Sequence, residues 1–143
     1  MSASELLAGE RTRGERNNNP GNIERSSAPW GGKVLGLDSR FECFDCPENG
    51  IRALGKILLT YQRRHKLRTI EDIIGRWAPP SENDTDAYVR SVASALGTPQ
   101  DVLLDLENET TLAALVRAII HHENGRVSYS QAVIDEGVER ALA

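Results

Sequence analysis

The stretch that most restricts how this chain can fold is Arg13-Gly14-Glu15-Arg16-Asn17-Asn18-Asn19-Pro20-Gly21-Asn22-Ile23. Asparagine, proline and glycine favour turns, through side-chain bonds to nearby backbone, a fixed φ and tolerance of positive φ. The stretch therefore predicts a compact loop rather than a helix or a strand. Its amides suit a ligand with hydroxyl and acetamido groups, but they can also serve only the backbone of their own loop.

Length and composition predict one globular domain. The chain has 143 residues, of which 39% are hydrophobic and 27% are charged, which is ordinary for such a domain. We expect a flexible tail at residues 1–12 and a single domain over residues 13–143. No apolar run approaches the roughly 20 residues that a membrane-spanning helix needs, so stable membrane insertion is not expected. Residues 1–8 lack the features of a secretory signal, so export would need another route.

Five segments have the apolar spacing of amphipathic helices. The expected helices are residues 50–64 with Glu48 or Asn49 as N-cap, 70–77 capped by Thr69, 86–96 capped from within 81–85, a helix capped by Thr110 or Thr111 that runs to His122, and 130–142. Alternating polar and apolar residues near Arg40–Phe44 predict a short strand in a small hairpin. The expected fold class is mainly α, with a small β element (α+β).

The fourth of these helices ends in a carboxyl group that could be reactive. Its apolar stripe consists of Leu112, Leu115, Val116 and Ile119, and Glu123 lies on the same face one turn later. Partial burial and the negative end of a helix dipole both favour a protonated carboxyl group, as a general acid requires. The alternative is a surface glutamate at a frayed helix end. Further candidate carboxylates, none singled out by spacing, are Glu15, Glu24, Glu82, Asp84 and Asp86.

Other charged and metal-binding patterns are weaker. The basic cluster Arg63, Arg64, Lys66 and Arg68 could contact nucleic acid, but it is short and is more simply a solvated helix end. Cys43 and Cys46 form a lone CxxC without the second ligand pair of a zinc site. The adjacent His121 and His122 lack metal-ligand spacing. We therefore expect no metal, no cofactor and no nucleic-acid partner.

Several motifs in a fixed order resemble a phage and prophage family of virion structural proteins and lysozyme-like cell-wall enzymes. The resemblance covers about residues 13–140. The matching motifs are residues 13–23, Trp30-Gly31, Arg40-Phe41-x-x-Phe44, Gly50-Ile51-Arg52-Ala53 and residues 77–88.

A looser resemblance is to the bacterial glucosaminidases of the lysozyme superfamily. Residues 18–23 look like their asparagine-rich loop, and residues 77–88 look like their Tyr-Ala…Tyr segment. In those enzymes the glutamate-bearing helix precedes the loop, whereas here residues 119–125 look like that helix. We infer a circular permutation, which is tolerable when chain termini lie close together. Residues 18–23 and Glu123 should then line one groove.

The resemblance implies a lysozyme-like domain that cleaves the glycan strands of peptidoglycan. Glu123 would be the catalytic acid, and the substrate-binding residues would be Asn18, Asn22, Trp77 and Tyr88. Because no second carboxylate stands out, a single-acid route fits best, either a lytic transglycosylase or a substrate-assisted mechanism. The protein would be made in the host cytoplasm and act on the wall after release or within a phage particle.

Two other classes of function remain open at this point. One is a non-enzymatic virion or tail component that keeps the fold and has phage virion proteins as partners. The other is a nucleic-acid-binding module that uses residues 63–68, whose affinity would fall steeply with salt.

Overall fold

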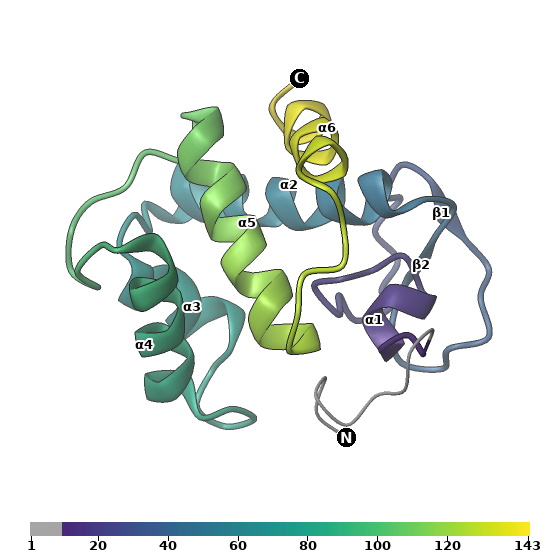
Figure 1. Cartoon of the computed structure of the whole chain (residues 1–143), viewed down its shortest axis with the longest axis horizontal. Coiled ribbons are helices and arrows are strands. Elements are labelled where there is room, and N and C mark those ends of the chain that lie inside the picture. Colours follow the sequence, from purple (N-terminus) through teal and green to yellow (C-terminus); the bar gives the residue numbers. More distant parts are fainter. Residues whose placement is uncertain (1–9) are drawn as a thin grey trace.

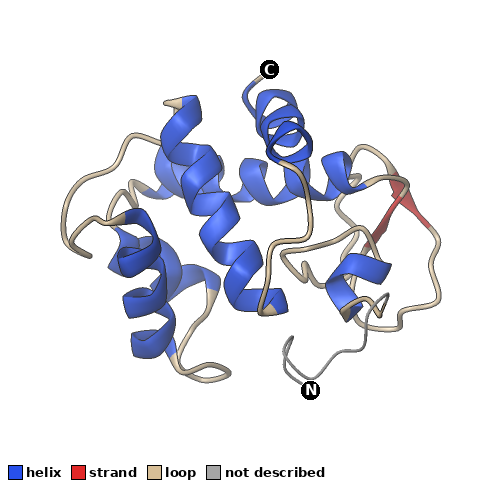
Figure 2. Cartoon of the chain, viewed as in Figure 1, coloured by secondary structure: helices blue, strands red, loops and turns tan. Residues whose placement is uncertain are grey.

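Helices form most of the regular structure, and a short two-stranded sheet lies at one edge (Figure 2). The computed structural model describes residues 10–143, so residues 1–9 of the expected tail lie outside the described residues. The mainly α, α+β fold class is confirmed. The elements are α1 (Arg13–Arg16), β1 (Lys33–Val34), β2 (Cys43–Phe44), α2 (Pro47–His65), α3 (Ile70–Trp77), α4 (Thr85–Leu96), α5 (Glu109–Asn124) and α6 (Gln131–Leu142).

Side-chain caps explain where three of the expected helices begin. Thr69 caps α3 by accepting a hydrogen bond from the Asp72 backbone N–H, as predicted. Asp84 caps α4 from within the predicted segment. Ser130 caps α6 through the Val133 N–H. Polar residues at these positions are local signals, so the helix starts could be found without tertiary information.

The predicted caps of α2 and α5 were wrong. Cys46 is the N-cap of α2 and Pro47 opens that helix, because proline has a φ suited to the first helical position. Glu48 and Asn49 therefore lie inside its first turn. Asn108 caps α5 by accepting a hydrogen bond from the Thr111 N–H.

The start of the turn-rich stretch is also helical, contrary to expectation. Thr12 and Glu15 form a capping box, in which the Thr12 side chain accepts from the Glu15 N–H and the Glu15 side chain accepts from the Thr12 N–H. This closes the single turn of α1. The loop begins after it, and Asn18 and Asn22 adopt positive φ values of 51° and 52°.

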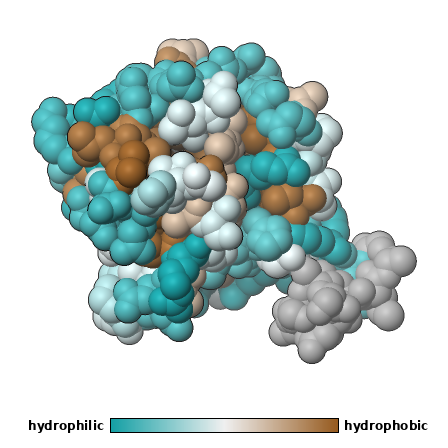
Figure 3. All heavy atoms as spheres, turned by 60° about the vertical axis from the view of Figure 1, so that its left-hand side comes forward, coloured by the Kyte–Doolittle hydropathy of each residue, from teal (hydrophilic) through white to brown (hydrophobic). Residues whose placement is uncertain are grey.

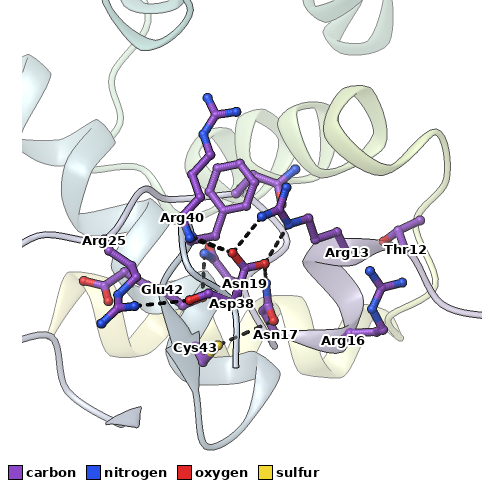
Figure 4. Close-up of polar contacts among 12 residues, drawn as sticks. Thr12, Arg13, Arg16, Asn17, Asn19, Arg25, Asp38, Arg40, Glu42 and Cys43 are labelled. Atoms are coloured by element: carbon purple, nitrogen blue, oxygen red, sulfur yellow. Dashed lines mark hydrogen bonds and ion pairs between the residues drawn. The ribbon is translucent and has the colours of Figure 1, made fainter. Parts of the chain in front are cut away.

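The predicted hairpin is present. β1 and β2 are antiparallel, with Lys33 opposite Phe44 and Val34 opposite Cys43. Figure 4 shows Asp38, in the connection between the strands, as the centre of a polar cluster. Its carboxylate accepts hydrogen bonds from Arg13 at 2.6 and 2.8 Å and from the Asn17 amide at 2.9 Å. The Arg13 guanidinium holds the pKa of Asp38 well below its usual range, and the cluster fixes the hairpin to α1.

The core lies around α2, which packs along α6 and contacts α5 (Figure 1). Gly137 of α6 lies directly against Ile51 and the Glu48 carbonyl of α2, so the two helices approach closely. α3 and α4 lie at one end of the molecule and α1 with the sheet at the other, and the C-terminal end of α5 lies between them (Figure 1). The largest fully buried side chains include Tyr88, Ile51, Leu54, Leu58, Ile73, Leu115 and Ile119.

The surface is largely hydrophilic on the side that carries α3 and α4, where hydrophobic residues gather in separate patches (Figure 3). Large exposed hydrophobic side chains include Val34 of β1, Leu35 and Leu37 in the connection after β1, and Val102 and Leu103 in the connection between α4 and α5. Within residues 10–143, no helix combines the length and apolar character needed to cross a membrane.

Candidate functional site

A pocket of about 380 Å³ separates the asparagine loop from the start of the α3–α4 connection. One wall consists of residues 21–24 and 40–41, and the other of residues 77–78 and 82–83. α2 contributes Ile57 and Tyr61, and α5 contributes Glu123. The pocket thus collects residues from across the whole described chain and combines carboxylates, amides and aromatic rings. Small-ligand sites typically combine apolar and aromatic side chains with a few placed polar groups, and this pocket has both kinds.

The Glu123 carboxylate is held by donors from two other segments. The Asn22 amide donates to Oε1 at 3.1 Å, and the Tyr88 hydroxyl donates to Oε2 at 2.8 Å. Gly21, Asn22 and Ile23 line the same pocket as Glu123, so the expected shared groove is confirmed for residues 21–23, whereas residues 18–20 do not line it. These bonds fix both oxygens of the carboxylate.

Tyr88 lies beneath the pocket rather than at its surface. Its side chain is 1% exposed, and its hydroxyl accepts a hydrogen bond from the Trp77 indole N–H at 3.1 Å. Burial, together with the charge of Glu123, raises the pKa of Tyr88, so the hydroxyl keeps its proton and remains a donor. Tyr88 was expected to contact the sugar, but its hydroxyl contacts Glu123 instead. Trp77 lines the pocket, and its contact with substrate stays a prediction.

The His122 ring stacks on Tyr88, with ring centroids 3.6 Å apart and planes inclined by 22°. Desolvation lowers the pKa of His122, which favours the neutral imidazole. The stack covers one face of the Tyr88 ring. His122 thus supports the tyrosine that holds Glu123.

The asparagines of the loop divide into structural and pocket-lining residues. Asn19 is fully buried, and its amide donates to the carbonyls of Ile23 at 3.0 Å and Glu42 at 2.9 Å. Asn18 donates to the Phe44 carbonyl at 3.0 Å and does not line the pocket, although it was expected to bind substrate. Asn22 alone among them reaches Glu123. The loop is therefore built largely by its own asparagines.

Asn124, which the sequence interpretation did not single out, joins the loop to α5. Its buried amide donates to the Pro20 carbonyl at 2.8 Å, and its Oδ1 accepts from the Thr12 hydroxyl at 2.6 Å. The position next to Glu123 thus docks the loop beside the carboxylate. A polar residue directly after the candidate acid was the only signal that could have suggested it.

Glu15, one of the candidate carboxylates, is part of a buried ion pair. Its carboxylate accepts from Arg126 at 2.6 Å and from the Ser128 hydroxyl at 2.6 Å. Burial alone would raise its pKa, but the bonds from Arg126, Ser128 and the Thr12 backbone lower it to about 2. Glu15 does not line the pocket, so its role is to fix α1 to the segment after α5.

Two arginines of the basic cluster make structural contacts. Arg63 pairs with Glu107 at 2.6 Å, and Arg68 donates to the Leu104 carbonyl at 2.8 Å. Neither Cys43 nor Cys46 forms a disulfide bond. Among residues 10–143, no group of three or more His, Cys, Asp or Glu side chains is arranged to hold a metal ion.

Comparison with known proteins finds a phage relative. Protein P5 of Pseudoalteromonas phage PM2 is 45% identical over 134 residues, which cover 91% of this chain and 82% of the phage protein. The chain belongs to the family of this phage protein. No family model matches the sequence. Membership of the P5 family agrees with the phage origin expected from the motifs, and the name Protein P5 states no activity.

Proposed function

We propose that this protein cleaves the glycan strands of peptidoglycan, with Glu123 as general acid. The observation that carries the proposal is the Glu123 carboxyl group, which lines a polar, aromatic pocket and is fixed through both oxygens by Asn22 and Tyr88. A general acid must be held at hydrogen-bond distance from the oxygen that it protonates. Two fixed donors from separate segments give Glu123 that restraint.

The pocket suits a sugar. The partly exposed rings of Tyr61 and Trp77 can pack against the apolar faces of sugar rings, and the Asn83 amide can bond hydroxyl or acetamido groups. A volume of about 380 Å³ lies within the range of small-ligand pockets. We assign substrate contact to Trp77 and a positioning role to Asn22 and Tyr88.

In the proposed reaction, protonated Glu123 gives its proton to the glycosidic oxygen as the bond from that oxygen to C1 breaks. Glu123 is then a carboxylate, and the Asn22 amide and the protonated Tyr88 hydroxyl donate to it. Donors that strengthen as charge develops favour the transition state over the ground state. The acetamido oxygen or the C6 hydroxyl of the sugar, or a water molecule, then bonds to C1. The proton that a hydroxyl or a water molecule loses passes to the Glu123 carboxylate or to solvent.

Membership of a phage protein family is compatible with an activity in phage lysis or wall penetration, but the name of the relative states no activity. Membership is equally compatible with a second candidate, a non-enzymatic component of a phage particle that has virion proteins as partners. Activity on isolated cell wall separates the two.

The test is the release of soluble fragments from purified sacculi by wild type, Glu123→Gln and Glu109→Gln. Glu109 is a matched control because it lies on the same helix, at the end away from the pocket. We expect Glu123→Gln to lose at least about 100-fold in rate, within the usual contribution of a general acid, while Glu109→Gln stays active. Equal activity of Glu123→Gln and wild type contradicts the proposal, and an inactive wild type supports the non-enzymatic candidate.

A further inference from the structure

The pocket contains carboxylates besides Glu123, and these carboxylates differ in their hydrogen-bond and ion-pair partners. Glu24 and Glu82 both line the pocket. Glu24 is paired, because its Oε1 accepts from Arg40 at 2.8 and 3.2 Å. The Arg40 guanidinium also lies 4.9 Å from the centre of the Phe41 ring, which fixes the pair at the pocket rim. The charge of Glu24 is thus already balanced.

The remaining candidate carboxylates have structural roles or lie elsewhere. Glu15 is buried against Arg126 and lies outside the pocket. Asp84 caps α4 through the Ala87 N–H at 3.1 Å. Asp86 is in the first turn of α4 and does not line the pocket. The sequence could not rank these residues as candidates for a second catalytic carboxylate, but their contacts in the structure do.

Glu82 is different because its backbone is held while its carboxylate is not. The Glu82 N–H donates to the Pro79 carbonyl at 3.1 Å, and the Thr85 hydroxyl ties the same connection to the Ala78 carbonyl. Within residues 10–143, the Glu82 side chain has no hydrogen-bond or ion-pair partner, and it is exposed. A carboxylate without a protein partner is free to bind a water molecule and to accept a proton from it.

We propose that Glu82 is the second carboxylate of the site and activates the water that attacks the sugar. The inference rests on the proposed function and makes the protein a hydrolase rather than a lytic transglycosylase. Glu123 protonates the glycosidic oxygen, the bond from C1 to that oxygen breaks, and the water oxygen bonds to C1. Glu82 takes the proton that the water loses. The products are a free alcohol and a reducing sugar, and proton exchange with solvent restores both carboxyl groups.

The test uses Glu82→Gln with Asp86→Asn as the matched control, since Asp86 is an exposed carboxylate four residues away that lies outside the pocket. The substrate is a preparation of peptide-free glycan strands. We expect Glu82→Gln to lower kcat by roughly 10²- to 10⁴-fold with little change in KM, because a general base contributes about this much. The low-pH limb of the kcat/KM profile should also disappear, because that limb reports ionisation of the base. Asp86→Asn should keep wild-type kinetics.

Mass spectrometry of the products provides an independent readout. Wild type should give reducing ends, and 1,6-anhydro ends would overturn the role of Glu82. Full activity of Glu82→Gln, or an equal loss in Asp86→Asn, would overturn it as well. If Glu123→Gln is inactive while Glu82→Gln is active, only the role proposed for Glu82 is overturned. If wild type cuts no glycan, the proposed function is overturned as well.

Discussion

Tyr88 and Tyr129 are two tyrosines with buried hydroxyl groups but opposite hydrogen bonding. The Tyr88 hydroxyl donates to Glu123 and accepts from Trp77. The Tyr129 hydroxyl has no hydrogen-bond partner among residues 10–143, and burial raises its pKa to about 12. Comparing the two tyrosines therefore distinguishes how much a hydrogen-bonded buried hydroxyl contributes to stability from how much an unbonded one does.

Tyr88→Phe should lower the free energy of unfolding by about 1–3 kcal/mol, because it removes a donor from Glu123 and an acceptor from Trp77. Tyr129→Phe removes a hydroxyl that bonds nothing described, so its effect should stay within about 0.5 kcal/mol or be stabilising. Urea unfolding at pH 7 measures both. Equal losses in the two variants would show that the Tyr88 bonds contribute nothing specific.

Glu15 should make stability depend on pH in the acid range. Its pKa is lowered from 4.5 to about 2 in the folded protein. A carboxylate with a lowered folded-state pKa stabilises the fold above the unfolded pKa, and this contribution is lost as pH falls through the folded pKa. The window for Glu15 is therefore about pH 4.5 down to about pH 2.

We expect wild type to lose roughly 3 kcal/mol across that window through Glu15. Glu15→Gln should start less stable at pH 7 and lose less on acidification. Urea unfolding at pH 7 and pH 3 measures the difference between the two curves. Parallel curves for wild type and Glu15→Gln would contradict the assigned ion pair with Arg126.

At the scale of elements, two helical glycines occupy contrasting surroundings. A Cβ added at Gly50 of α2 would overlap the Asn18 carbonyl, because the asparagine loop lies directly on that helix. A Cβ at Gly75 of α3 would meet nothing within 4 Å. The asparagine loop therefore packs on α2 at Gly50, where there is no room for a side chain.

Gly50→Ala should destabilise the protein by about 1–3 kcal/mol and displace the loop that carries Asn22. Gly75→Ala should stabilise it by up to about 1 kcal/mol, because alanine favours a helix where space permits. Thermal unfolding of both variants checks the signs. A stabilising effect of Gly50→Ala would contradict the close packing of loop and helix.

Helices and strands could be predicted where their signals, apolar spacing and capping residues, lie close together in the sequence. The spacing of apolar residues and caps such as Thr69 and Ser130 identified helices close to their true bounds. α1 was missed because its capping box, Thr12 and Glu15, stands among residues that favour turns. Cys46 was missed as a cap because cysteine gives no capping signal, and its side chain makes no cap hydrogen bond.

At the scale of the whole molecule, the site depends on contacts that no local pattern encodes. Asn22 and Glu123 are 101 residues apart in sequence, and their shared groove was predicted only from a family resemblance. The sequence could not show that Asn18 and Tyr88 have structural roles rather than pocket-lining ones. Their burial and contacts depend on the tertiary fold, which no local pattern encodes. Asn124 joins the two halves of the site through a contact that spans 104 residues.

The most direct test of the account is mass spectrometry of purified sacculi incubated with wild type and Glu123→Gln. Cleavage by Glu123 in the pocket between residues 21–24 and 77–83 should cut bonds between sugars. We expect wild type to release fragments with new glycan-chain ends, and Glu123→Gln to release almost none. Intact glycan strands after incubation with wild type, or equal release by Glu123→Gln, would contradict the assignment.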